Sequence, residues 1–340
     1  MTRPGNFHAL PPAATPLTLP PATTPLSELL ASGHFRAAAI LSARQLAAPP
    51  SQTQLSAVQI LSLWHIRLTA TCLLEYEQIA ADESPALGDV VDGVIYRSPE
   101  NGESILPWGL RVLAVRLQAR AEGDLGRGII NMHVLAREAR RRARQGGEDD
   151  DGPRLWAERL ADLQVRVVSL LIEMGDLDGA ARMLEGSKAQ HKNLTAEKQT
   201  LLDARLILLY LHIGNVQRAK EIMSTASTRD ANAVSLLQPL LVMAEGADSP
   251  KDSPSVDDDA ALQNKAVQML YSGNLEGAKA LLREAIERDV RFPTLIFNLT
   301  TMFELTSENP KELKMELAQD LAAKGSPGLG IEHSVADLKL

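Results

Sequence analysis

The residue types that carry out chemistry are present in this chain, but they do not stand in reactive patterns. Two glycine-rich runs, GDLGRG at 123–128 and GSPGLG at 325–330, look like phosphate-binding loops, yet neither follows a predicted strand. The seven histidines are scattered, and no two stand at the spacing of metal ligands. The sequence contains neither a Walker A motif nor a Gly-x-Ser-x-Gly elbow. We therefore expect a protein that is not an enzyme, with no catalytic residues, no cofactor and no metal site.

The single cysteine, Cys72, excludes an intrachain disulfide and a cysteine-based metal site. It stands in an apolar helical run, so we interpret it as a small core residue and not as a nucleophile. This use of cysteine suits a reducing compartment, and no secretory signal or apolar run of membrane-spanning length is apparent. We expect a cytoplasmic protein that reaches membranes only indirectly.

The charge pattern offers one basic cluster in an acidic chain. The net charge of −8 argues against general nucleic-acid binding, which requires an excess of cationic side chains. The run REARRRAR, Arg137–Arg144, has two interpretations: contact with an acidic partner or anionic lipid, or a solvated helix end near the acidic run at 148–151. We favour the solvated helix end and leave lipid contact open.

Helical periodicity dominates the elements that would position any site. Apolar residues recur three and four apart, and aromatic residues make up only 4% of the chain, which favours helices packed on helices. Loops are expected at 82–105, and acidic loops at 145–152 and 244–259, the second with two Ser-Pro pairs. The expected organisation is a disordered Pro/Thr-rich tail (1–25), an α-solenoid (26–323) and a C-terminal tail (324–340).

A degenerate repeat runs through the helical region. Each copy has a glycine at the end of a helix, an apolar residue two positions later and a small residue five positions later. The repeat-defining glycine and small-residue pairs are Gly33 and Ala38, Gly123 and Gly128, Gly175 and Ala180, Gly214 and Ala219, and Gly273 and Ala278. Glycine permits the positive φ that often ends a helix, and a small residue lets two helices approach closely. The pattern predicts an all-α fold, a tetratricopeptide-like solenoid of helix pairs with a C-terminal capping helix. A degenerate pair is expected around Trp64 to Ala81.

The run FNLTTMFEL (297–305) follows the clearest repeat. With its flanking residues it resembles the closing segment of the subunit-twelve family of the TRAPP vesicle-tethering complex, and upstream blocks such as LWHIRLTATCLL resemble that family in the same order. Helical spacing predicts that Phe297, Leu299, Met302, Phe303 and Leu305 pack the cap onto the last repeat, with Asn298 and Thr301 exposed. Whether this run serves only as a cap or also contacts a partner is left open.

The resemblance implies a non-catalytic scaffold subunit of a TRAPP III-type complex, which activates a Rab-family GTPase in ER-to-Golgi transport and autophagy. Its implied partners are other large peripheral TRAPP subunits, and indirectly the core and the GTPase, at ER–Golgi and Golgi membranes. The acidic insert at 244–259 departs from the family pattern. The alternative is a tetratricopeptide chaperone adaptor that binds peptide C-termini. That interpretation is weakened because the helix LLDARLILLYLHIG offers an apolar stripe where such adaptors carry a polar clamp.

Overall fold

The structure is a computed structural model that describes residues 2–11, 23–49, 54–98, 102, 104–145, 152–190, 195–227, 237–246, 259–288 and 293–323. These residues form α-helices and short 3-10 turns, and the β-structure found among them is an isolated antiparallel bridge between Arg97 and Ser104. The expected all-α fold is therefore confirmed. Within the described residues, no helix combines the length and apolarity needed to cross a bilayer.

The chain divides into two compact units, one made of Met1–Asp124 with Asp257–Leu340 and the other of Leu125–Val256. The first part of unit one contains η1 (Pro4–Asn6), α1 (Leu26–Ala31), α2 (Phe35–Ala47), α3 (Ala57–Leu73), α4 (Glu77–Glu83), η2 (Ser84–Leu87), η3 (Val94–Tyr96) and α5 (Trp108–Ala121). Its last part contains α13 (Asp259–Tyr271), α14 (Leu275–Glu287), α15 (Pro293–Thr306) and α16 (Pro310–Ala323). Unit two contains α6 (Leu125–Gln145), α7 (Gly152–Glu173), α8 (Leu177–Gln190), α9 (Ala196–Ile213), α10 (Val216–Ser227) and α12 (Gln238–Ala244).

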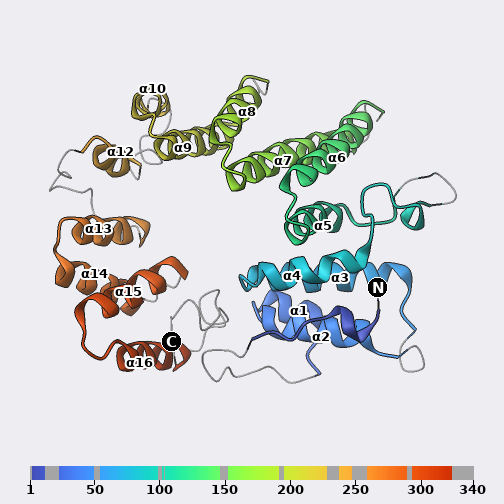
Figure 1. Cartoon of the computed structure of the whole chain (residues 1–340), viewed down its shortest axis with the longest axis horizontal. Helices are drawn as coiled ribbons and strands as arrows, with labels where there is room; N and C mark the ends of the chain where they lie inside the picture. The colour runs from blue at the N-terminus through green and yellow to red at the C-terminus, as the bar shows by residue number, and fades with distance from the viewer. Residues whose placement is uncertain are drawn as a thin grey trace. The chain divides into compact units, whose positions relative to one another are not determined.

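Within each unit, helices contact chiefly the helices next to them in sequence. The pairs α2 and α3, α7 and α8, α9 and α10, and α13 and α14 each lie side by side (Figure 1). Such a succession of neighbour contacts is what a helical solenoid requires, since each element buries its apolar face against the next one.

One type of turn follows α1, α3, α5, α7, α9 and α13. A residue with positive φ donates its N–H to the carbonyl three residues earlier, and the next residue donates to the carbonyl five residues earlier, which is a Schellman motif. The residues with positive φ are Gly33, Glu75, Gly123, Gly175, Gly214 and Gly273, with φ between 63° and 86°. At Gly214 the bond is to Leu211 O (3.1 Å), and Asn215 donates to Tyr210 O (2.8 Å).

The residue after the glycine caps the N-terminus of the next helix. Asp176, Asn215 and Asn274 each accept, at Oδ1, the N–H of the residue three positions later, at 2.9, 3.1 and 3.0 Å. These side chains satisfy N–H groups that a helix start otherwise leaves unpaired. A C-cap and an N-cap on successive residues thus make each connection very short.

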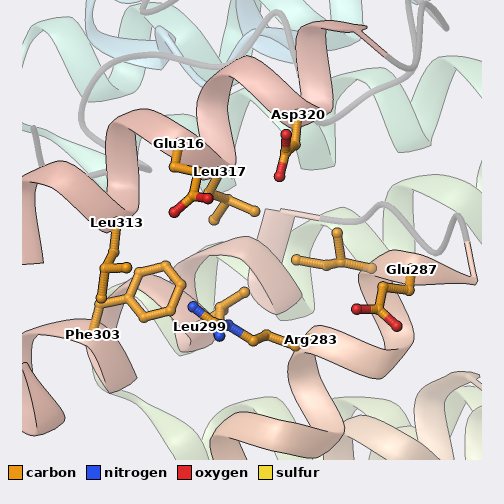
Figure 2. Close-up of a pocket in the computed structure, with 9 residues that line it drawn as sticks. Arg283, Glu287, Leu299, Phe303, Leu313, Glu316, Leu317 and Asp320 are labelled. Carbon is orange, nitrogen blue, oxygen red and sulfur yellow. The ribbon is translucent and has the colours of Figure 1, made fainter.

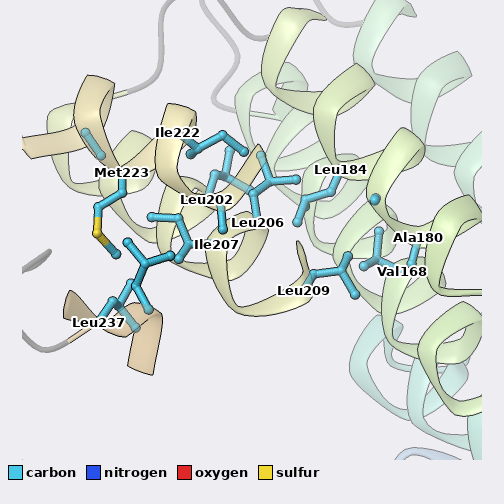
Figure 3. Packing of buried hydrophobic residues seen from close by; sticks show 14 residues of the cluster. Val168, Ala180, Leu184, Leu202, Leu206, Ile207, Leu209, Ile222, Met223 and Leu237 are labelled. Atoms are coloured by element: carbon cyan, nitrogen blue, oxygen red, sulfur yellow. The ribbon is translucent and has the colours of Figure 1, made fainter. Parts of the chain in front are cut away.

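The core of unit two shows how the pairs stack. Side chains from α7, α8, α9, α10 and α12 interleave there (Figure 3). Leu206 and Ile207 on α9 are 1% and 0% exposed, and they belong to the same buried cluster as Leu184 of α8 and Met223 of α10. Because this core runs continuously across successive pairs, each pair depends on its neighbours for burial.

The expected loops and tails lie partly outside the described residues. Of these segments, the described residues do not include 1, 12–22, 99–101, 103, 146–151, 247–258 and 324–340. Residues 2–11, which belong to the expected Pro/Thr tail, are described, and they contact α2, α3 and α4. The expected loop at 82–105 begins later than the sequence suggests, because α4 and η2 extend helical structure to Leu87.

Candidate functional site

The repeat-defining residues form helix junctions and helix seams. Gly33, Gly123, Gly175, Gly214 and Gly273 each end a helix in the left-handed region, as described above. The small residues are buried: Gly128 lies on a buried position of α6, and Ala38, Ala180, Ala219 and Ala278 are 0% exposed. Ala80, five residues after Glu75, is also 0% exposed. The arrangement gives these residues a place in packing and offers no reactive group.

Helix α15 carries the run FNLTTMFEL and has two different faces. Leu299, Met302 and Phe303 are buried (1–2% exposed), as the sequence predicts for a packed cap. Phe297 and Leu305 are 43% and 58% exposed, so the prediction that they pack in the cap is wrong. Residues two positions apart in a helix point about 200° apart, and Phe297 precedes Leu299 by two while Leu305 follows Phe303 by two. Asn298 and Thr301 are half-buried, not exposed.

The threonines of this run bond to their own helix. Thr300 and Thr301 both donate their hydroxyl to the carbonyl of Phe297, at 2.8 and 2.9 Å. Bonds of this kind satisfy a hydroxyl inside a helix without a partner from another element. Thr300, which is 0% exposed, can therefore be buried among apolar side chains.

A cavity of about 250 Å³ lies between α14, α15 and α16 (Figure 2). Leu299 and Phe303 of the run form part of its wall, and the Arg283 guanidinium lies 5.3 Å from the centroid of the Phe303 ring. The other charged groups that line it are carboxylates, those of Glu287, Glu316 and Asp320. This excess of negative charge favours a cationic group over an anionic one. Among the described residues, no three or more His, Cys, Asp or Glu side chains gather closely enough to hold a metal ion.

An ion pair fixes α16 to α15 beside this cavity. Lys314 Nζ of α16 lies 2.7 Å from Glu304 Oε1 of α15, and the Lys314 side chain is only 5% exposed. A cation that is largely removed from water needs such a partner, so the pair fixes the register between the two helices.

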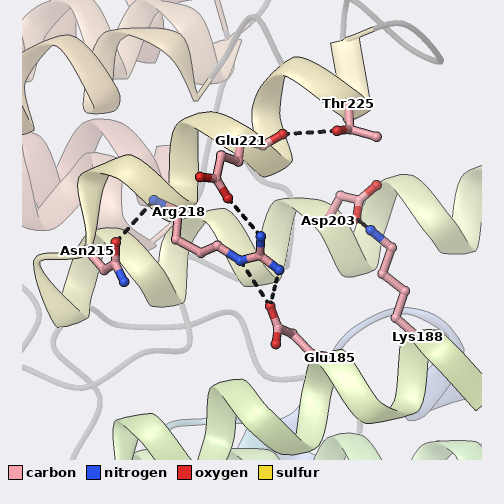
Figure 4. A network of polar contacts seen from close by, with 7 residues as sticks. All are labelled: Glu185, Lys188, Asp203, Asn215, Arg218, Glu221 and Thr225. Atoms are coloured by element: carbon pink, nitrogen blue, oxygen red, sulfur yellow. Dashed lines mark hydrogen bonds and ion pairs between the residues drawn. The ribbon is translucent and has the colours of Figure 1, made fainter.

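A second polar network crosses the helix pairs of unit two (Figure 4). Arg218 of α10 donates to Glu185 of α8 (2.9 Å) and to Glu221 one turn further along α10 (2.8 Å). Glu221 and, after it, Glu185 raise the pKa of Arg218, because their hydrogen bonds stabilise its charged form. Lys188 of α8 also bonds to the buried Asp203 of α9. These contacts link successive helices of unit two and set the register between them.

The structure places Cys72 and the arginine cluster in packed surroundings. Burial raises the pKa of the Cys72 thiol to about 11, which keeps the thiol protonated and unreactive near neutral pH. In the arginine cluster, Arg142 pairs with Glu138 (3.0 Å) and its guanidinium lies 4.7 Å from the Trp156 ring centroid. The acidic run at 148–151, expected to face the cluster, lies outside the described residues.

A second cavity, of about 490 Å³, lies between α7, α8 and α9, and of the apolar stripe that the sequence identifies on α9, Leu201 lines it. Leu201 and Leu208 of this stripe are 52% and 45% exposed. Lys198 and Arg205 of α9 line the cavity beside Leu201. The sequence prediction did not include these two cations, because it considered one face of the helix only. Glu158 and Asp162 of α7 also line it, so the cavity has charged groups of both signs.

The fold and these surfaces define a helical protein of stacked helix pairs, with exposed apolar side chains and without a catalytic constellation among the described residues. No protein-family model matches the chain. Over 88% of its length the chain is 24% identical to the human and mouse proteins named trafficking protein particle complex subunit 12 (Homo sapiens and Mus musculus). The chain is thus distantly similar to this subunit. The match spans less than half the length of these curated relatives, 46% of the human protein and 42% of the mouse protein.

Proposed function

We propose that this chain acts as a non-catalytic subunit of a trafficking protein particle (TRAPP) complex. The observation that carries the proposal is the similarity to subunit 12 over 88% of the chain. The exposed helical surfaces described above suit a protein that works through contacts with other proteins.

In the finer form of this proposal, the chain is a scaffold of a TRAPP III-type assembly. It joins other large peripheral subunits, while small core subunits carry out nucleotide exchange on a Rab-family GTPase. Its site of action is then the ER–Golgi and Golgi membranes, in vesicle transport and autophagy, reached through the complex. The repeats are of tetratricopeptide type in this proposal, and α15 with α16 closes their C-terminal end.

The outer face of α15 is the contact surface that we assign to another subunit. Phe297 and Leu305 lie eight residues apart, so they project from about the same side of the helix, on either side of Thr301. Both are large apolar side chains that are substantially exposed, and they belong to the run that resembles the subunit-twelve family. Burial of such a pair at a protein interface removes apolar surface from water and stabilises the complex.

The test is affinity purification of the tagged protein from its own cells, with the co-purifying proteins identified by mass spectrometry. We expect core and peripheral TRAPP subunits in fixed ratio. The double variant Phe297→Ser/Leu305→Ser is expected to lose the peripheral subunits while keeping the circular dichroism spectrum of the wild type. Val58 on α3 is 70% exposed, and Val58→Ser serves as the matched control that retains them.

Two outcomes would contradict the proposal in different ways. Recovery of chaperones without any TRAPP subunit favours the alternative, an adaptor for peptide C-termini. If the double variant recovers TRAPP subunits at the wild-type level, the result supports membership of the complex but excludes the outer face of α15 as the contact surface.

A further inference from the structure

Residues 7–11 lie along α2, α3 and α4 in the way that a bound peptide lies on its receptor. The Phe7 ring lies 5.0 Å from the Trp64 ring of α3, centroid to centroid, at an interplanar angle of 37°. The main chain of His8 is held at both of its polar groups, and the carbonyl of Pro11 accepts a bond from Arg36 of α2.

The groups that hold His8 are a buried ion pair. Arg67 of α3 and Glu83 of α4 are each 1% exposed, and Arg67 Nε lies 2.9 Å from Glu83 Oε2. Glu83 Oε1 accepts the N–H of His8 (2.7 Å), and Arg67 Nη2 donates to the carbonyl of His8 (2.9 Å). Arg67 is itself fixed by a bond from Nη1 to the carbonyl of Ala39 (3.2 Å). The pair is therefore pre-oriented to hold one residue of an extended chain by its main chain.

The surface of α2, α3 and α4 contacts only a few side chains of the segment. Peptides of other sequences can therefore make the same contacts. The side chains of His8 and Ala9 are exposed, while Phe7 and Leu10 are half-buried. Main-chain bonds at His8 do not depend on the side chain at that position, whereas the Trp64 contact favours an aromatic ring at the position before it. The chemistry recognised is an extended peptide with an aromatic residue followed by a residue of any type except proline, which lacks the N–H.

We propose that this surface of α2, α3 and α4, formed around Trp64, Arg67 and Glu83, is a docking site for such a peptide from a partner protein. Residues 7–11 of the chain itself occupy the site and compete with the partner segment. This inference stands apart from the proposed function, because it rests on contacts in the first helices and on no relative. A segment tethered to its own site acts at an effective concentration of about millimolar, so a partner segment must bind well to displace it.

The test uses the full chain, its Phe7→Ala variant and a fluorescent synthetic peptide with the sequence of residues 2–11. Phe7→Ala removes the ring that anchors the internal segment but leaves Trp64, Arg67 and Glu83 unchanged. Fluorescence anisotropy is expected to show that the variant binds the peptide at least about tenfold more tightly than the wild-type chain, since its internal competitor is weakened. No binding to a Phe7→Ala chain that keeps its helical circular dichroism spectrum and cooperative unfolding would overturn the proposal.

Two altered peptides distinguish recognition of the main chain from nonspecific binding. The His8→Ala peptide is expected to bind as the unaltered peptide does, because this side chain is exposed. The His8→Pro peptide is expected to lose binding by at least about tenfold, because it has no N–H to donate to Glu83. Equal binding of the two peptides contradicts the proposal.

A cross-link gives the position of the peptide directly. A peptide with benzoylphenylalanine in place of Phe7 is expected to label α3 close to Trp64 in the Phe7→Ala chain after irradiation. Labelling confined to any other helix excludes this surface as the binding site.

Discussion

Glu75 occupies a backbone position that glycine fills in the corresponding turns of the chain. Its φ is 63°, and its hydrogen bonds follow the Schellman pattern: Glu75 N–H to Cys72 O (2.9 Å) and Tyr76 N–H to Thr71 O (3.1 Å). A side chain in the left-handed region costs about 1–2 kcal/mol, because Cβ approaches the neighbouring carbonyl. This turn joins α3 to α4, the pair that the sequence predicted as degenerate between Trp64 and Ala81.

We predict that Glu75→Gly raises the free energy of unfolding by about 0.5–1 kcal/mol, because the relief of backbone strain exceeds the extra flexibility that glycine gives the unfolded chain. The Glu75 side chain is exposed, so its loss subtracts little from this gain. Urea denaturation followed by circular dichroism measures the change.

Gly214→Ala is the matched reverse variant. Gly214 has a φ of 86°, and an added Cβ there would meet no atom within 4 Å, so the cost is that of the backbone alone. We expect a loss of about 1–2 kcal/mol. If both variants change the free energy of unfolding in the same direction, the cost of a side chain in the left-handed region does not explain the stability change at either position.

At the scale of single residues, the sequence predicts glycine turns well and other turns badly. Gly33, Gly175 and Gly273 are recognisable because glycine is the usual residue at a left-handed helix end. Glu75 gives no such signal, and neither do Arg67 and Glu83. An ion pair formed between residues on two helices depends on how those helices pack, which local sequence does not specify.

At the scale of elements, α14 shows how one small residue sets the distance between helices. Ala278 is 0% exposed and lies in the helix that packs on α13 and α15. Ala280, two residues later on the same helix, is exposed. The two alanines share their local helix and differ in what surrounds them.

We predict that Ala278→Ile destabilises the protein by about 1–3 kcal/mol, since extra methyl groups in a filled seam force neighbouring side chains or helices to shift. Ala280→Ile adds the same side chain to the surface and is expected to change stability by less than about 0.5 kcal/mol. Thermal unfolding of the two variants in parallel provides the comparison. An unchanged melting temperature in Ala278→Ile would contradict the register assigned to the repeat.

The faces of the helices are less predictable than their existence. Helical periodicity identifies α15, but its run of apolar residues surrounds the helix, so spacing alone does not say which side is buried. The structure buries Leu299 and Phe303 and exposes Phe297 and Leu305, because α14 and α16 contact one side only. The buried face of such a helix can be identified only when the positions of the neighbouring helices are known.

At the scale of the whole molecule, stability is expected to be local. Helices contact chiefly their sequence neighbours, and the chain divides into two units with α9 in one and α14 in the other. In such an arrangement the loss of a buried side chain weakens its own pair and the pairs beside it, and the effect falls off along the chain. The helix-pair plan that predicts this behaviour was recognisable from the repeat, whereas the division into units depends on contacts between segments distant in sequence.

Hydrogen exchange measured by mass spectrometry on two reciprocal variants tests this locality. Leu206 of α9 and Leu282 of α14 are 1% and 2% exposed, and replacing either by alanine removes about 2–5 kcal/mol of packing. We predict that Leu206→Ala speeds amide exchange in α8, α9 and α10 and leaves α13 and α14 at their wild-type rates. Leu282→Ala is expected to do the opposite. Equal acceleration of every helix by both variants would mean that the chain unfolds as one cooperative body, because only then does the loss of a side chain in one unit reach the amides of the other.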